Sequence, residues 1–281
     1  MSFIPPDMLR SFAVDAARAA SAVATGYGFD IPKPVTEALT ALVELDQIER
    51  STLPVSRPDP KKLRASLARI ASDARAQTDL LEAAREARPL LVAESIAAAR
   101  AASVSWGDQL AAQWDEVWKQ FVIVRPGAPL NIDSWTTSEQ AAAHVETLRA
   151  IDKLDRLLLD RVTLGKAAGE DPPAAGIVTF VAGLPPVPEA PQDVEPAWEA
   201  LGGALGKWVA GGPMLTTGTR QALTGRERWE SLLTVDGLDI AMAPITGGIL
   251  GARITQHGRW QTAIGTLHSL GGAAAFRQLA R

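Results

Sequence analysis

The sequence predicts an α+β protein with a predominantly helical N-terminal body, followed by a small antiparallel β-meander region. Three observations lead to this class. Apolar residues recur at helical spacing through most of the first 164 residues, prolines crowd into the next stretch, and short β-prone runs separated by turn residues follow. We therefore expect three parts: a helical body (1–164), a proline-rich connector (165–197) and a small α+β domain (198–281).

The helical body is expected to begin with two amphipathic helices. Residues 7–26 carry apolar side chains near helical spacing and stop at glycines, and residues 35–50 repeat the pattern before a run of prolines. A third helix has the clearest start signal. Asp59 can accept backbone donors at the cap, and Pro60 gives up no hydrogen bond in the first turn.

A long helix is predicted from residue 59, with one apolar face towards the core. The members of this face lie three, four or seven residues apart: Leu63, Leu67, Ile70, Ala74, Leu81 and Ala84. Pro89 either kinks the helix or begins another, and residues 90–121 continue the helical pattern. Two long antiparallel helices are therefore the expected packing. A short strand at 121–124 is expected to open the connection that follows.

The next helix is predicted to run from a capping box at Thr136 and Glu139 to about Leu164. Its predicted buried stripe consists of Leu148, Ile151, Leu154, Leu158 and Val162. The charged residues between them, among them Asp155 and Arg161, are predicted to lie on the solvated faces of the helix.

The remaining elements are expected to be mainly strands. Asp236 and Gly237 suit the type I′ turn of a hairpin, because both residue types tolerate positive φ angles. The predicted strands are 177–182, 232–235, 238–242, 249–255 and 260–267, with short helices at 197–210 and 273–280. The strands on both sides of the turn and after it would form the small antiparallel meander.

Composition and motifs exclude several kinds of site. The chain has 281 residues and no cysteine, which excludes disulfides, zinc ribbons, iron–sulfur clusters and thiol nucleophiles. Its three histidines, His144, His257 and His268, lack the i,i+4 pairing of a helical metal site. Phosphate-loop, dinucleotide-binding and nucleophile-elbow motifs do not occur either, so we expect no metal and no cofactor.

Charge and hydropathy bear on partners and location. The net charge of −4 provides no global field that would recruit nucleic acid, so a nucleic-acid partner is not expected. The N-terminus has no cationic leader followed by an apolar run, and no apolar stretch is long enough for a membrane span. We therefore expect a soluble protein with no secretion signal and no membrane contact, located in the cytoplasm or assembled in a virion.

Eight tryptophans are the chemically unusual feature, because the chain has only one tyrosine and six phenylalanines. A helix core stripe is the simpler explanation for the three that lie eight and four residues apart. An interface is the alternative, because tryptophan is enriched in interface hot spots. The interface candidates are Trp106, Trp114, Trp118, Trp229 and Trp260. The arginines near the last two are candidates for polyanion contacts: Arg226, Arg228 and Arg259.

These observations favour a noncatalytic structural or interaction subunit, whose partners are other protein subunits in an oligomer or particle. An alanine-rich composition with far more arginine than lysine is typical of GC-rich genomes, and a phage-like virion of a GC-rich bacterial host is the expected setting. Two alternatives stay open. One is an enzyme of unfamiliar type that uses Asp236, Asp239 and His257 near the β region. The other is a nucleic-acid accessory protein that binds through the three arginines.

Overall fold

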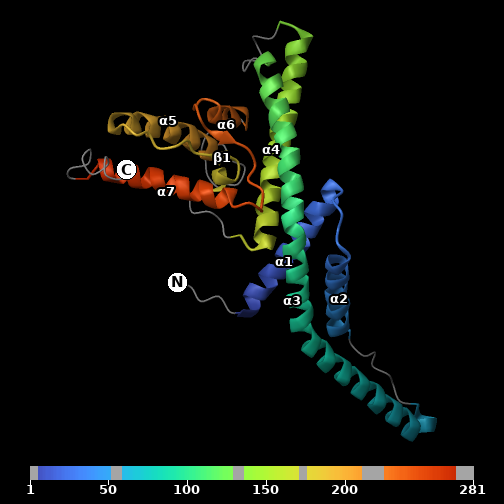
Figure 1. Ribbon diagram of the computed structural model, residues 1–281. Helices are drawn as coiled ribbons and strands as arrows, with labels where there is room; N and C mark the ends of the chain where they lie inside the picture. The colour runs from blue at the N-terminus through green and yellow to red at the C-terminus, as the bar shows by residue number, and fades with distance from the viewer. Residues whose placement is uncertain (1–5, 52–58, 129–135, 171–175, 211–224, 270–281) are drawn as a thin grey trace. The chain divides into compact units, whose positions relative to one another are not determined.

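A computed structural model describes residues 6–51, 59–128, 136–170, 176–210 and 225–269. These residues are mostly helical, and they include a small antiparallel sheet of two strands (Figure 1). The prediction of a predominantly helical protein with a small antiparallel β region is therefore confirmed. The sheet among the described residues has two strands instead of the predicted meander.

The contacts between residues divide the chain into two compact units, Met1–Ser103 and Val104–Arg281. This division differs from the one that composition suggests, because helices from both sides of the proline-rich connector pack together within the second unit. The predicted division into 1–164, 165–197 and 198–281 stays a prediction about domains.

The first unit contains α1 (Pro6–Tyr27), α2 (Lys33–Arg50), the 3₁₀ turn η1 (Pro60–Lys62) and the first part of α3 (Leu63–Val124). The predicted helices 7–26 and 35–50 are confirmed. The predicted start at Asp59 is confirmed as well, since its side chain accepts a hydrogen bond from the backbone N–H of Lys61 at 2.9 Å.

Helix α3 continues through Pro89 without interruption, so the segments on either side of this proline are one helix and not an antiparallel pair. Figure 1 shows α3 bending in its first half, and a proline inside a helix removes one backbone hydrogen bond and crowds the preceding turn. The predicted strand 121–124 is wrong, because these residues form the last turn of α3. A short 3₁₀ turn, η2 (Arg125–Gly127), follows.

The second unit contains the remainder of α3 and helix α4 (Ser138–Ala168). The predicted capping box lies one residue further along: Thr137 accepts from the N–H of Gln140 at 3.3 Å, and the Gln140 side chain accepts from the N–H of Thr137 at 3.2 Å. Gly169, with φ of 87°, ends α4 in the left-handed conformation that glycine adopts most easily.

The described residues of the second unit include three further helices: α5 (Pro191–Ala210), α6 (Gly225–Leu232) and α7 (Ile249–Leu267). Helix α5 contains the predicted helix 197–210 and begins inside the predicted connector. The predicted strand 177–182 is instead a 3₁₀ turn, η4 (Ile177–Phe180), followed by the two-residue strand β1 (Ala182–Gly183). The predicted helix 273–280 lies outside the described residues.

The hairpin and the meander are wrong in detail. Residues 232–235 belong to the end of α6 and the turn after it, so they form no strand. The expected turn residue Gly237 does have a positive φ of 78°, but strand β2 (Asp239–Ile240) pairs with β1. Ala182 is opposite Ile240, and Gly183 is opposite Asp239. Asp236 has no positive φ, so the type I′ hairpin turn is wrong although residues 236 and 237 do lie in a turn, and the strand partner of β2 is not its sequence neighbour.

The predicted strands 249–255 and 260–267 form one helix, α7. Its buried residues are Leu250, Arg253, Trp260 and Ala263, which share one helical face. Helix α7 packs against α5, η4 and β1. This packing outweighs the β-propensity of its isoleucines and threonines, because local preference is worth only tenths of a kcal/mol per residue.

Candidate interaction surface

The first third of α3 has almost no cover from the other described residues. None of residues 63–83 is buried, and the first buried side chain of the helix is that of Ala84. Leu63 and Leu67 are 51% and 49% exposed, and Leu80, further along the helix, is 46% exposed. Most of the stability of a helix in a protein comes from packing of its amphipathic face against another element. The exposed leucines of this helix are therefore unusual for a folded protein without a partner.

Leu63 and Leu67 belong to the face that the sequence predicts for the core, together with Ile70, Ala74 and Leu81, whereas Gln77 was not part of that prediction. We call the following set the α3 stripe: Leu63, Leu67, Ile70, Ala74, Gln77 and Leu81. The expectation that this face is buried in the chain is wrong for Leu63 and Leu67, because α2 reaches only the far end of the stripe. There, Gln77 Nε2 donates a hydrogen bond to Ser51 Oγ at 3.0 Å.

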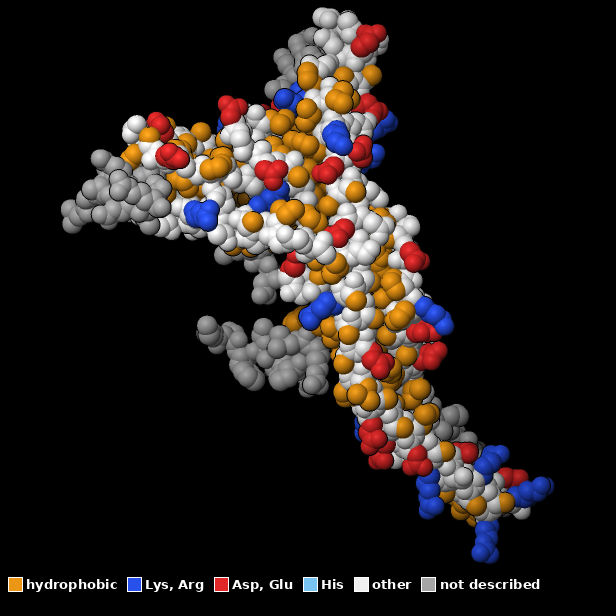
Figure 2. All heavy atoms as spheres, viewed as in Figure 1, with side chains coloured by type: hydrophobic (Ala, Val, Ile, Leu, Met, Phe, Trp, Pro, Cys, Tyr) orange, Lys and Arg blue, Asp and Glu red, His pale blue; other side chains and the backbone are white. Residues whose placement is uncertain are grey.

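The charges around the α3 stripe are unevenly distributed along the helix. Residues 61–75 carry five basic side chains and one acidic one, a net charge of +4, whereas residues 76–87 carry three acidic side chains and one basic one, a net charge of −2. Figure 2 shows Lys and Arg side chains gathered at the free end of α3, with Asp and Glu side chains further along the helix. The stripe thus has a basic end and an acidic end.

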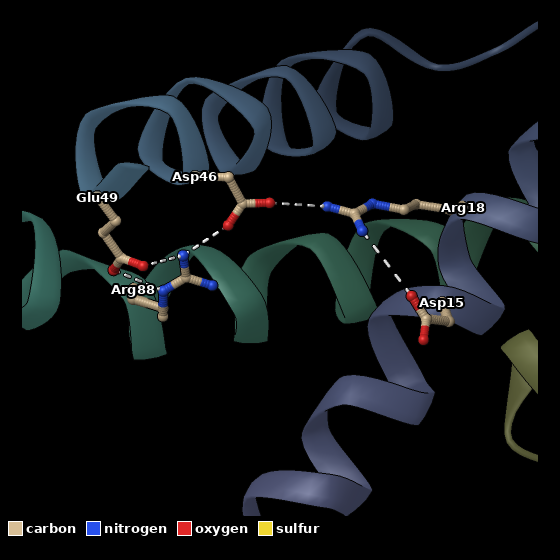
Figure 3. Close-up of polar contacts among 5 residues, drawn as sticks. All are labelled: Asp15, Arg18, Asp46, Glu49 and Arg88. Carbon is tan, nitrogen blue, oxygen red and sulfur yellow. Dashed lines mark hydrogen bonds and ion pairs between the residues drawn. The ribbon is translucent and has the colours of Figure 1, made fainter. Parts of the chain in front are cut away.

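The three helices of the first unit are joined by a network of ion pairs just beyond the stripe (Figure 3). Arg88 of α3 donates to both Glu49 oxygens, at 2.9 and 2.7 Å, and to Asp46 Oδ1 at 2.6 Å. Arg18 of α1 lies 3.5 Å from the other oxygen of Asp46. The hydrogen bond from Arg88 lowers the pKa of Asp46 below its ordinary value. This network holds α2 antiparallel to α3 at the point where α2 begins to cover α3.

A shallow groove of about 470 Å³ lies between α2 and α3 in the same unit. Its lining is mainly small and apolar, and two carboxylates belong to it: Pro34, Ala38, Leu91 and Ala97 are among the lining residues, with Glu37 and Glu94. Such a lining provides a small apolar surface with two carboxylates. It contains no nucleophile and no pair of an acid with a base that would point to a reaction.

The tryptophans proposed as interface candidates lie in the interior of the second unit. Trp106, Trp114 and Trp229 are buried, and Trp118 is partly buried and stacks on Trp114 with ring centroids 5.4 Å apart. Trp229 touches both of these rings and that of Trp208. This cluster joins α3, α5 and α6, which agrees with the core explanation that the sequence favoured.

Trp260 belongs to a second, separate cluster between α5 and α7. It is buried with Val194, Leu201 and Ala263, and its ring stacks on Trp198 at 5.6 Å. Its Nε1 donates a hydrogen bond to the carbonyl of Pro185 at 2.8 Å. The ring thus fastens part of the proline-rich segment to α7 and is not presented to a partner.

Two of the three arginines proposed for polyanion contacts are buried. Arg226 pairs with Glu230 at 2.8 Å and also donates to the carbonyl of Arg125. Arg228 binds Asp155 and lies over the Trp208 ring, 4.1 Å from its centroid. Of the three, only Arg259 is exposed. Asp155 therefore lies in a partly buried pair and not on a solvated face, and burial raises its pKa.

The sequence interpretation missed two further buried arginines, Arg161 and Arg253. Arg161 donates to the carbonyl of Ala243 at 2.7 Å and binds both oxygens of Glu170. Arg253 donates to the carbonyls of residues 179, 180 and 241, and to Asp239 Oδ2 at 2.9 Å. Arg161 was expected on a solvated face. Its position one turn after Leu158 on the apolar side of α4 was the available signal.

The catalytic alternative gains no support from the positions of its residues. Asp236 is exposed, Asp239 is held by Arg253, and His257 packs with its ring edge against Trp198. Burial lowers the pKa of His257. Within the described parts of the chain, no group of three or more acidic or histidine side chains is arranged to hold a metal ion.

No helix among the described residues combines the length and the apolar character that crossing a bilayer would require. No protein-family model matches the chain, and neither a curated protein nor a solved structure matches it at the threshold applied.

Proposed function

We propose that this chain is a noncatalytic interaction subunit that joins a larger protein assembly through the α3 stripe. The observation that carries the proposal is the exposure of Leu63 and Leu67 on a helix whose first 21 residues include no buried side chain. Exposed apolar surface that continues along one helical face is typical of a protein contact. The buried arginines and tryptophans of the second unit are used for internal packing, so the proposal rests on α3 and not on them.

The test compares two leucine variants of the same helix. In extracts of the native source, the wild-type chain should sediment in a particle far heavier than the 29.7 kDa of one chain. Leu67→Glu should release it from that particle. Leu90→Glu, at a side chain that is 68% exposed and lies outside the stripe, should not. A wild-type chain that sediments alone contradicts the proposal.

A virion component is the narrower form of this proposal, and composition alone supports it. Its test is the protein content of particles purified from the source culture. The chain should copurify at a constant ratio to the other particle proteins. If it stays in the supernatant when the particles are removed, the narrower form is wrong, although an interaction role elsewhere would stand.

A further inference from the structure

We infer that the exposed beginning of α3 from one copy of this chain docks in the groove between α2 and α3 of the next copy. The inference rests on the proposed function and names the partner. One side of the contact is the exposed end of the α3 stripe with its flanking cations, which we call the α3 free end: Lys62, Leu63, Arg64 and Leu67. It lies clear of α2, because Ser51 at the end of α2 contacts α3 at Gln77, ten residues after Leu67.

The α3 free end has an apolar centre with a cation on each side. Leu63 and Leu67 lie about one turn apart on one helical face, and both are about half exposed. Successive residues are rotated by about 100–120° around a helix, so Lys62 and Arg64 lie on opposite sides of Leu63. Both cations are exposed. This surface therefore suits an apolar groove that has a negative charge on each wall.

The groove between α2 and α3 has that complementary arrangement. Its lining includes four alanines, two from each helix: Ala38, Ala41, Ala97 and Ala98. Glu37 of α2 and Glu94 of α3 provide one carboxylate on each wall. Small side chains leave room for large ones, so the two leucines fill the groove of about 470 Å³, and the two cations approach the carboxylates.

Glu37 also has a partner on its own helix, because Lys33 Nζ lies 3.1 Å from Glu37 Oε1. These two side chains are 85% and 62% exposed, and an exposed pair of this kind contributes little free energy. Lys33 can therefore turn towards solvent when another cation approaches Glu37. The apolar contact supplies most of the affinity, and the charges select the orientation of the docked helix.

The two sides of the contact cannot belong to one chain. Leu63 and Leu91 lie on the same continuous helix, 28 residues apart, which is about 42 Å along its axis. The interval of 27 residues from Leu67 to Glu94 corresponds to about 7.5 turns, so the α3 free end and the groove lie on opposite sides of α3. Opposite sides disfavour a closed pair in which each copy fills the other's groove. Each added copy thus leaves one free end and one groove open, and association continues past the dimer.

The first experiment measures the mass of the purified full-length chain over a concentration series. The wild type should pass twice 29.7 kDa as concentration rises. Leu67→Glu should raise the dissociation constant by about tenfold or more, because it places a carboxylate against an apolar lining that already has two. Ala97→Arg should do the same, because it fills the groove and repels the cations of the free end.

Two substitutions of the same kinds provide the controls. Val43→Glu on α2 and Ala83→Arg on α3 change exposed side chains outside both surfaces and should leave the dissociation constant unchanged. Leu67 and Ala97 are also exposed in the single chain, so the helical circular dichroism of all four variants should match the wild type. Equal weakening by the variants and their controls would overturn the inference.

The second experiment tests whether the two sides of the contact differ. Leu67→Glu retains its groove, and Ala97→Arg retains its α3 free end, so an equimolar mixture should form dimers through one intact contact and grow no further. A mixture that stays monomeric, or a wild type that stays monomeric or stops at the dimer, would overturn the inference. A monomeric wild type that still occurs in a heavy native particle would leave the proposed function intact.

Discussion

Arg161 and Glu170 form a two-bonded ion pair at the end of α4, with Nη1 2.6 Å from Oε2 and Nη2 3.0 Å from Oε1. Arg161 is 0% exposed, and its Nε donates to the carbonyl of Ala243, more than 80 residues away. One side chain thus ties the end of α4 to the loop before α7. An arginine can do this because its guanidinium has five donors in a fixed planar fork.

Replacing Arg161 by alanine should lower the free energy of unfolding of the second unit by about 3–5 kcal/mol, because Glu170 would remain partly buried without its partner. Tryptophan fluorescence during urea unfolding measures this unit specifically, since all eight tryptophans lie between residues 106 and 260. Arg156→Ala on the same helix is the matched control: its side chain is 76% exposed and should contribute less than about 1 kcal/mol. Equal effects of the two substitutions would contradict the structural role of Arg161.

Gly165→Ala should disturb the same ion pair. A Cβ atom at this position would collide with Glu170 Oε2 and lie 2.8 Å from Arg161 Nη1, so the two charged groups would have to separate. We expect a loss of about 1–3 kcal/mol, although alanine is the better helix former. Gly202→Ala in α5 meets no atom within 4 Å and should instead stabilise by about 0.5–1 kcal/mol. Urea unfolding of both variants checks the difference in sign.

Acid should weaken the first unit through Asp46. The folded-state pKa of Asp46 lies below its ordinary value of 3.8, so its ion pair stabilises the fold fully above pH 3.8. This contribution, about 1 kcal/mol, is lost as pH falls through the folded-state pKa. Asp46→Asn should therefore be less stable than the wild type at neutral pH, and the difference should shrink on acidification.

Unfolding of the first unit is followed by circular dichroism. Tryptophan fluorescence does not report it, because the first unit contains no tryptophan. The exposed Asp73 provides a control on α3. If the gap between Asp46→Asn and the wild type were constant across the acid range, or if Asp73→Asn behaved identically, the ion pair would not be the cause.

Two stronger local signals predicted structure correctly. The cap at Asp59 and the capping pattern near Thr137 marked helix starts within one residue, because the side chain that satisfies the free backbone donors is a close sequence neighbour. Residues 249–267 were predicted wrongly as strands. Their isoleucines, threonines and glycines have weak preferences, and the partner that decides their conformation comes from α5, more than 40 residues away.

The candidate surface was predicted only in part. The apolar face from Leu63 to Leu81 was visible as a pattern, but a pattern shows that a face needs cover and does not show whether the same chain supplies it. For the tryptophans the sequence favoured a core stripe and left an interface as the alternative, and the structure places Trp114, Trp229 and Trp260 in the interior.

The amino-acid order by itself determined the helices of the first 164 residues and their starts at Asp59 and near Thr137, the apolar stripe with its opposite charges at the two ends, and the missing cysteine chemistry. Only the tertiary structure decided that Arg161, Arg228 and Arg253 are internal and that Leu63 and Leu67 are not. The physical reason is that capping and periodicity act between near neighbours, whereas burial depends on which distant segment arrives at a surface. For Arg161 that segment is the loop at Ala243, and for Leu67 the described chain provides none that buries it.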